Sequence, residues 1–180
     1  MEISKDKNLF WIDTETTGLN YDMDVLLEIA STITDLDLNI VAEGPNLVIH
    51  QDDKVFKNLL DSVRGMHEKS GLVSASKKSK VSLEEAEDKT LQFVTTYCGF
   101  KTSPFCGNTV GFDKEMVRKH MPRLFRYLHY RTIDVSSVKE LAKRWYPNLP
   151  LFEKKGGHRA LDDIRESIEE LKYYRSKIFC

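Results

Sequence analysis

Two carboxylates near the beginning of the chain occur where a strand would present them together. Asp13 and Glu15 are two residues apart and follow the apolar run of residues 8–12. If the strand continues through them, both side chains point to one face, because side chains alternate along a strand. Open α/β sheets place ligands at the carboxyl ends of strands, and paired carboxylates there can hold a divalent cation. Two solvated turn acids fit the same pattern equally well.

The helix expected at the end of the chain contains a further candidate carboxylate, which its apolar stripe distinguishes from a neighbouring one. The apolar stripe of this helix consists of Leu161, Ile164, Ile168, Leu171 and Ile178. Projection at about 100° per residue places Asp162 nearly opposite the stripe and Asp163 at its edge. Asp163 is therefore expected to reach inward toward the sheet, whereas Asp162 faces water.

A histidine and one more acid complete the set of candidates. His158 follows two glycines, five residues before Asp163, where a loop meets the start of the last helix. Asp113 lies where a glycine-rich turn after residues 104–107 leads into a basic helix. A single histidine at a helix start is more often a surface or capping residue, and an acid there often only complements the helix dipole. These two residues alone leave both interpretations open.

The strands that must position these residues follow from composition and turn signals. Runs rich in apolar and β-branched residues predict strands at residues 8–13, 28–34, 40–50, 104–107 and 132–135. The first three are expected to form an antiparallel meander. We interpret Lys77–Lys80 as a polar connector that marks no domain boundary. The simplest interpretation of these elements is a single α/β domain with a mixed sheet, covering residues 1–180.

Helices are indicated between and after the later strands. Ser82 is expected to cap a helix, with Glu85 completing a capping box. A basic helical stretch is predicted over residues 112–128, with a break near Pro122. Ser137 is expected to cap the helix that follows the last strand.

Taken together, the candidate residues resemble the three sequence motifs of the DEDDh 3′-to-5′ exonucleases. The motifs are Asp13-Thr14-Glu15, Asn108 with Asp113, and His158 with Asp163. Longer strings resemble the oligoribonucleases of that superfamily: Trp11–Leu19, Ala42–Pro45, Ser70–Leu72, Cys106–Asn108, His129–Arg131, Asp134–Ser136, Lys139–Leu141 and Asp162–Ser167. The resemblance extends from about Leu9 to Arg175.

This resemblance implies a fold and an activity. The expected fold is the ribonuclease H-like exonuclease fold, a mixed five-stranded sheet flanked by helices. The expected activity is 3′-to-5′ degradation of oligoribonucleotides of two to a few nucleotides to 5′-mononucleotides. The alternatives are an exonuclease acting on DNA or structured RNA 3′ ends, a catalytically silent nucleic-acid-binding module, and an α/β domain whose acids are merely solvated.

The resemblance also assigns catalytic roles. Asp13, Glu15 and Asp163 would hold one Mg²⁺ or Mn²⁺ ion, and Asp13 with Asp113 would hold a second. Two such ions activate the attacking water and stabilise the leaving oxygen. His158 would be the general base, and an ordinary histidine pKa of about 6.5 suits that role near neutral pH.

Substrate contacts are likewise implied by the resemblance, at Leu19, His67, Asn108, Thr109, Tyr130, Arg131 and Ser136. Thr109, Arg131 and Ser136 would bind the phosphate at the 5′ side of a short RNA, with Arg131 making a charge-assisted contact. Tyr130 would reach into the site of a partner subunit, so a homodimer is expected. Simple helix-end packing is the alternative for Tyr130.

One departure from the family pattern concerns the bases. Many relatives carry a tryptophan a few residues before the histidine that corresponds to His67, where this chain has Ser62 or a neighbour. Leu19 and His67 remain candidates to pack on bases. Because stacking a base on an aromatic ring contributes about 1–3 kcal/mol, we expect weaker selection for dinucleotides here than in relatives with tryptophan.

The overall composition limits which binding partners and which cellular compartment are expected. The 180 residues include 27 Lys and Arg against 28 Asp and Glu, which excludes a uniformly basic protein that holds long nucleic acid. Residues 1–53 carry 12 acidic and 2 basic side chains, so the remainder is basic. Three widely spaced cysteines indicate reduced thiols, and no run approaches the 18 or so apolar residues of a membrane span. A cytoplasmic protein without a membrane partner is expected, with an organelle such as the mitochondrion as the alternative.

Overall fold

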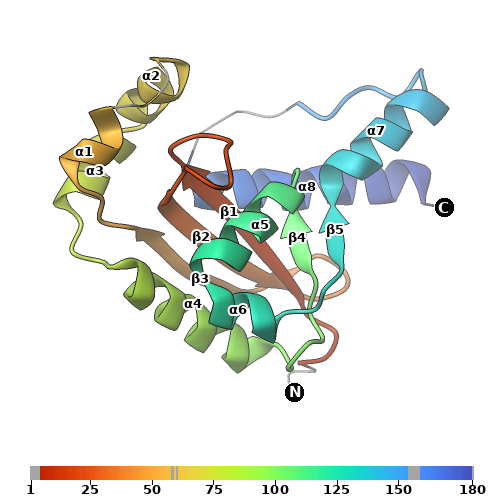
Figure 1. Ribbon diagram of the computed structural model, residues 1–180. Coiled ribbons are helices and arrows are strands. Elements are labelled where there is room, and N and C mark those ends of the chain that lie inside the picture. Colours follow the sequence, from red (N-terminus) through yellow and green to blue (C-terminus); the bar gives the residue numbers. More distant parts are fainter. Residues whose placement is uncertain (1–4, 58, 60, 154–158, 180) are drawn as a thin grey trace.

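A mixed sheet of five strands forms the centre of the structure, a computed structural model that describes residues 5–57, 59, 61–153 and 159–179 (Figure 1). The strands are β1 (Leu9–Thr16), β2 (Leu26–Thr34), β3 (Ile40–Val48), β4 (Phe105–Gly107) and β5 (Thr132–Asp134). Their order is β3-β2-β1-β4-β5. The first three strands pair antiparallel, and β4 and β5 run parallel to β1. The expected meander and the expected mixed five-stranded sheet are confirmed.

Helices cover both faces of this sheet. They are α1 (Asp53–Lys57), α2 (Asp61–Lys69), α3 (Leu72–Lys78), α4 (Leu83–Tyr97), α5 (Gly111–His120), α6 (Pro122–Tyr127), α7 (Val135–Trp145) and α8 (Ala160–Ile178). Figure 1 shows α4, α5 and α6 on one face and α8 across the other. The small helices α1 to α3 lie together at one end of the sheet, where α3 contacts β2 and β3 (Figure 1). Among the residues described, no helix has the length and apolarity to cross a bilayer.

The central strand β1 is buried on both faces, which explains its unbroken apolar run. Phe10 and Ile12 point into the core beneath α4 to α6, and Leu9 and Trp11 point into the smaller core beneath α8. Because side chains alternate, Asp13 follows Trp11 onto the α8 face. The strand thus delivers its carboxylates to the surface that α8 covers.

Local sequence signals account for some of the helix boundaries. Ser82 caps α4, since its hydroxyl accepts the backbone N–H of Glu85 at 3.1 Å. The predicted break near Pro122 is confirmed, because α5 ends at His120 and α6 begins at Pro122. Proline is favoured in the first helical turn, where its missing N–H has no intrahelical partner.

Two sequence-based expectations about local structure are wrong. Asp134, not Ser137, caps α7: its carboxylate accepts the backbone N–H of Ser136 at 2.9 Å, so the helix begins directly after β5. The expected connector Lys77–Lys80 is partly helical, because Lys77 and Lys78 form the end of α3. Helices α1 to α3 were not predicted, since they are short and bury few side chains, among them Phe56 and Leu72.

Candidate active site

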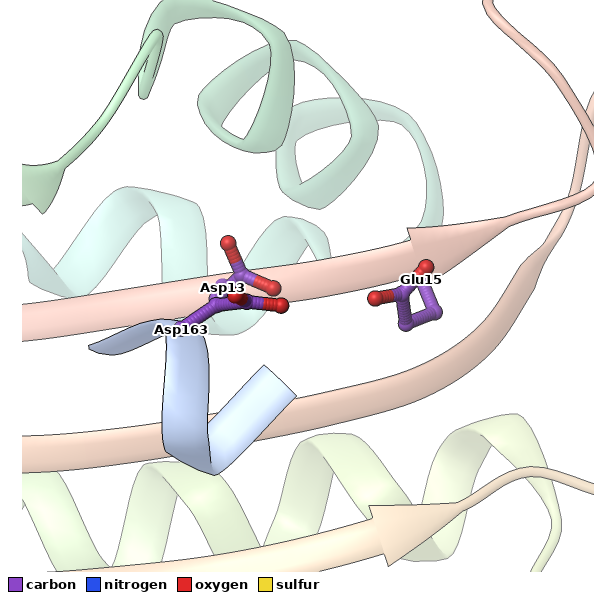
Figure 2. Close-up of side chains that lie close together, drawn as sticks. All are labelled: Asp13, Glu15 and Asp163. Atoms are coloured by element: carbon purple, nitrogen blue, oxygen red, sulfur yellow. The ribbon is translucent and has the colours of Figure 1, made fainter. Parts of the chain in front are cut away.

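Three carboxylates converge between the central strand and the last helix. Asp13 and Glu15 come from β1 and Asp163 comes from the first turn of α8, with side chains directed toward one another (Figure 2). One oxygen of each lies within 4.8 Å of the others, and all three are half-buried. Asp162 is exposed and lies 3.3 Å from Arg165, so the predicted division between the two neighbouring aspartates is confirmed.

Burial and mutual repulsion make these carboxylates hard to ionise together. Burial raises the pKa of Asp13 well above its ordinary value, and the charges of Asp113 and Glu15 raise it further. Burial, together with the charges of Asp163 and Glu28, raises the pKa of Glu15 to about 8. Such a cluster is stabilised either by protons or by a cation. Its all-oxygen donor set fits a hard divalent ion such as Mg²⁺ or Mn²⁺.

Asp113 lies on the other side of the end of β1. It is buried in the first turn of α5, and its Oδ1 accepts the backbone N–H of Thr14 at 2.9 Å and the hydroxyl of Thr14 at 2.7 Å. Burial raises the pKa of Asp113 to about 7, although the hydrogen bonds from Thr14 oppose that shift. The charge of Asp113 also raises the pKa of Asp13.

A cleft of about 390 Å³ opens beside these acids. It is lined by Asp13, Thr14, Glu15, Thr16, Gly18, Leu19, Val63, Met66, Asn108, Thr109, Phe112 and Asp113. Leu19 is 82% exposed at its edge, and Val63 and Met66 come from α2. The cleft therefore combines carboxylates, polar groups after β4 and an apolar wall, as a site for a small polar ligand requires.

Polar groups at the ends of β4 and β5 meet beside this cleft. Thr109 has a left-handed backbone (φ 54°), and its N–H donates to the carboxylate of Asp134 at 3.0 Å. The hydroxyls of Thr109 and Ser136 are 3.0 Å apart, and Ser136 also contacts Asn108. A residue other than glycine at positive φ is uncommon and is retained where surrounding contacts fix it. Three of the residues expected to bind substrate are thus brought together.

His67 differs from the expectation that it packs on a base. Its ring is completely buried, and Nε2 lies 2.8 Å from the carbonyl oxygen of Thr16. Because a carbonyl only accepts, Nε2 carries the hydrogen, and Nδ1 faces Glu15 at 3.9 Å. The ring has no exposed face for stacking and instead supports the end of β1 next to Glu15.

Tyr130 and Arg131 lie at the opposite end of the parallel strands. Both residues precede β5, and neither is among the residues that line the cleft. Tyr130 is 69% exposed, with the Arg131 guanidinium 5.5 Å from its ring centre. The structure does not bring these two residues into the cleft of the same chain.

Residue His158 lies outside the described part of the chain, but the next residue forms an ion pair that sequence reasoning missed. Arg159 donates from Nη2 to Glu28 Oε1 at 2.8 Å and from Nε to Oε2 at 3.1 Å. Glu28 is completely buried and pairs with Glu15 in the register of β1 and β2. A glutamate within the otherwise apolar strand Leu26–Thr34 was the signal available in the sequence. This ion pair ties the start of α8 to the sheet beside the carboxylates.

We expect Arg159→Met to destabilise the protein by about 2 kcal/mol, because it leaves the Glu28 carboxylate buried without its partner. Urea unfolding at pH 7 measures this free energy. The matched control is Arg165→Met, which removes an exposed pair with Glu43 and should cost less than about 1 kcal/mol. Equal effects of the two substitutions would contradict the importance assigned to the buried pair.

The chain is an exonuclease by family, and its sheet order, the helices on both faces and the carboxylates on the first strand and last helix agree with that assignment. The sequence model of the family described as Exonuclease matches residues 10–171. Solved structures agree on the fold: exonuclease I from Methylocaldum szegediense is 18% identical with a TM-score of 0.72, covering 95% of this chain and 41% of its own. A zinc-bound complex of E. coli exonuclease I with single-stranded DNA is 16% identical with a TM-score of 0.75, covering 96% and 41%. This chain therefore corresponds to less than half of exonuclease I.

Within the exonucleases, much closer similarity is to oligoribonucleases. The oligoribonuclease of Pseudoalteromonas atlantica is 53% identical over 174 residues, covering 96% of both chains. The probable oligoribonuclease of Dictyostelium discoideum is 50% identical over 175 residues, covering 97% of this chain and 92% of its own. The mitochondrial oligoribonuclease of Mus musculus is 49% identical over 175 residues, covering 96% and 74%. The chain belongs to the oligoribonuclease family.

Proposed function

We propose that this protein is a metal-dependent 3′-to-5′ exoribonuclease that degrades oligoribonucleotides of two to a few nucleotides to 5′-mononucleotides. The observation that carries the proposal is the convergence of Asp13, Glu15 and Asp163 within 4.8 Å beside a cleft. Relatives about half identical over nearly the whole chain carry the name oligoribonuclease, which supports the substrate class.

In this proposal Asp13, Glu15 and Asp163 hold one Mg²⁺ or Mn²⁺ ion, and Asp13 with Asp113 hold a second. The raised pKa values of Asp13, Glu15 and Asp113 support the assignment, because a cation removes the repulsion between neighbouring carboxylates. When bound, such ions polarise the scissile phosphate and neutralise charge that develops in the transition state. His158, two residues before α8, is proposed as the general base that takes a proton from the attacking water.

The substrate is proposed to lie along the cleft with its 5′-phosphate near Thr109 and Ser136. The hydroxyls of these two residues are adjacent, and Thr109 lines the cleft. Leu19, exposed at the edge of the cleft, is proposed to pack on a base. A hydroxyl pair binds a short substrate through one phosphate without the extended basic surface that long RNA requires.

A second copy of the chain is proposed to complete each cleft. Neither Tyr130 nor Arg131 lines the cleft of its own chain. Tyr130 would act in the cleft of a partner, and Arg131 is proposed to contact the 5′-phosphate together with Thr109 and Ser136. An apolar pocket of about 340 Å³ beside them supports this arrangement, lined by Phe100, Lys101, Phe125, Arg126, Leu128, His129 and Tyr130. A two-fold dimer would bury this surface on both copies.

We expect Phe100→Glu to convert the dimer to a monomer and to lower activity at least tenfold, because a charge would be buried in the contact. Sedimentation velocity at micromolar concentration measures the change. Phe179→Glu is the matched control, since Phe100 and Phe179 are 64% and 63% exposed. A Phe100→Glu variant that stays dimeric, or a wild-type protein that is monomeric, would refute the proposed contact.

Digestion of 5′-labelled RNAs of two to seven nucleotides, with and without Mg²⁺ or Mn²⁺, tests the proposed reaction. Stepwise shortening from the 3′ end that requires the metal is the expected result. DNA oligonucleotides of the same lengths and a hairpin with a 3′ overhang test the alternative substrates. Failure to release mononucleotides under any of these conditions would contradict the proposal.

Length preference is expected to be weak and to depend on α2. This helix borders the cleft through Val63 and Met66, and the position where many relatives have tryptophan is assigned to Ser62 or a neighbour. We expect Ser62→Trp to raise kcat/KM for a dinucleotide relative to a heptanucleotide by about tenfold, because one stacked base contributes about 1–3 kcal/mol. Competition between the two RNAs in one reaction measures the ratio. A wild-type preference already as strong as that of the variant would argue against the prediction.

The compartment that we propose is the cytoplasm. The three cysteines lack the spacing of a disulfide framework, and Cys98 and Cys106 are buried free thiols. A mitochondrial location is the alternative, because the mouse relative is named mitochondrial.

A further inference from the structure

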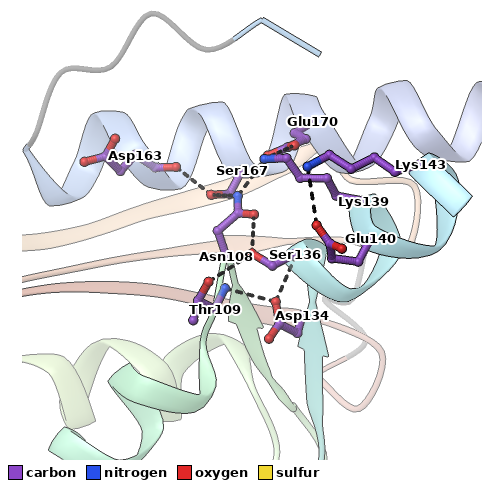
Figure 3. Close-up of polar contacts among 10 residues, drawn as sticks. All are labelled: Asn108, Thr109, Asp134, Ser136, Lys139, Glu140, Lys143, Asp163, Ser167 and Glu170. Carbon is purple, nitrogen blue, oxygen red and sulfur yellow. Dashed lines mark hydrogen bonds and ion pairs between the residues drawn. The ribbon is translucent and has the colours of Figure 1, made fainter. Parts of the chain in front are cut away.

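A chain of hydrogen bonds connects the cleft to the helical turn that bears Asp163 (Figure 3). The hydroxyls of Thr109 and Ser136 are 3.0 Å apart, and Ser136 donates to Asn108 Oδ1 at 3.0 Å. Asn108 Nδ2 donates to the hydroxyl of Ser167 at 2.7 Å. Ser167 in turn donates to the backbone carbonyl of Asp163 at 2.7 Å. We call Thr109, Ser136, Asn108 and Ser167 the relay.

A buried ion pair sets the direction of every hydrogen in the relay. Glu170 is completely buried in α8; its Oε1 lies 3.1 Å from Lys139 Nζ, and its Oε2 accepts from Asn108 Nδ2 at 3.1 Å. Because a carboxylate only accepts, the NH₂ group of Asn108 must face α8 and its carbonyl must face Ser136. Ser136 therefore donates to Asn108, and Thr109 is the donor to Ser136.

A phosphate near Thr109 and Ser136 would disturb this order. Both hydroxyl hydrogens point along the relay, whereas a phosphate oxygen can only accept hydrogen bonds. If Ser136 turns its hydrogen to a phosphate, the half-buried carbonyl of Asn108 loses that donor. The amide of Asn108 stays bonded to Ser167 and to the buried carboxylate of Glu170, so a shift of Asn108 toward another donor moves Ser167 with it.

We propose that Ser167 and Glu170 are positioning residues that couple binding of the substrate's 5′-phosphate to metal binding by the Asp163 carboxylate. Ser167 transmits the coupling because it holds the turn that carries Asp163. Glu170 sustains it by fixing the orientation of Asn108. This inference rests on the proposed function, in which Thr109 and Ser136 bind that phosphate.

The test measures Mn²⁺ affinity of the full chain by calorimetry in the presence of a dinucleotide with an uncleavable methylene phosphonate linkage. The dinucleotide is used with a 5′-phosphate and with a 5′-hydroxyl, and the ratio of the two Mn²⁺ Kd values is the coupling factor. We expect about tenfold coupling in the wild type, within the usual range for linked sites. Ser167→Ala and Glu170→Gln should each reduce it to less than about twofold.

Ser76→Ala is the matched control, because Ser76 is also a buried serine whose hydroxyl donates to a backbone carbonyl, that of Ile49, at 2.6 Å. It should retain the wild-type coupling. Full coupling in folded Ser167→Ala or Glu170→Gln would overturn the relay, and so would a wild-type factor of one. If Ser167→Ala does not fold, Glu170→Gln decides alone.

Binding of the two dinucleotides without metal separates the relay from the proposed function. Preference of the wild type for the 5′-phosphorylated form supports the phosphate site, and the relay then stands or falls by the variants. Equal binding of both forms would overturn the phosphate site and the relay with it.

Discussion

Asp163→Asn is expected to lower kcat at saturating Mn²⁺ by at least about a thousandfold while the protein stays folded. Asp163 is one of three residues whose carboxylate oxygens lie within 4.8 Å, so its loss weakens the cation site directly. A bound metal ion contributes several kcal/mol to transition-state stabilisation, and about 1.4 kcal/mol corresponds to a factor of ten in rate. Steady-state release of mononucleotides from a labelled dinucleotide measures kcat.

The neighbouring aspartate provides the control. Asp162→Asn changes the same chemical group one residue earlier in α8, but Asp162 is exposed and lies beside Arg165. It should retain activity within about twofold, since exposed ion pairs contribute little. Circular dichroism and thermal unfolding establish that both variants are folded. Comparable activity in the two variants would refute the assignment of Asp163 to the metal site.

The metal-free protein is expected to lose stability as the pH rises from about 4.5 to about 8. Glu15 has an ordinary pKa of 4.5 that burial, with the charges of Asp163 and Glu28, raises to about 8 in the folded protein. Within this interval the folded protein holds a proton that the unfolded chain has released. The free energy of unfolding therefore falls with increasing pH, and it levels off above pH 8. We expect a loss of about 3 kcal/mol, or about 5–10 °C in Tm.

Divalent metal should reverse this loss, because it replaces the protons in the cluster. Thermal unfolding with Mn²⁺ or with a chelator, at several pH values, is the measurement. The increase in Tm caused by Mn²⁺ should be larger at pH 8.5 than at pH 5.5. Glu15→Gln should reduce the pH dependence of the metal-free protein, leaving the part contributed by Asp13 and Asp113, whereas Asp162→Asn should preserve all of it. A Tm that does not depend on pH, or an equal effect of Mn²⁺ at both values, would contradict the prediction.

Periodicity in the sequence was sufficient to predict much of this fold and part of the candidate site. The central strand was indicated by the apolar run before Asp13, and the helical projection separated Asp163 from Asp162 correctly. Both are local properties, because side-chain direction within one element follows from its period. Pairing of β1 with β4 was not accessible in this way, since it joins segments about 95 residues apart.

Features that depend on tertiary contacts were missed or mistaken. Asp134 replaces the expected cap Ser137 because its carboxylate also binds the backbone of Thr109, a residue of another segment. The burial of His67 beneath the end of β1 likewise depends on how α2 packs. The pairing of Glu28 with Arg159 joins residues 131 positions apart. In each case the partner lies outside the local window from which a sequence pattern is interpreted.

The elements around the cleft differ in how deeply they are buried, and the hydrogen exchange of their amides should differ accordingly. Asp13 and Glu15 belong to the central strand, which has a neighbour on each side and buried cores on both faces. Helices α1 to α3 instead rest on a small cluster that includes Phe56, Leu59 and Leu72. Amides of β1 should therefore exchange only on global unfolding, while those of α2 exchange through local opening. The wall of the cleft formed by Val63 and Met66 should therefore be less protected from exchange than the strand that carries Asp13 and Glu15.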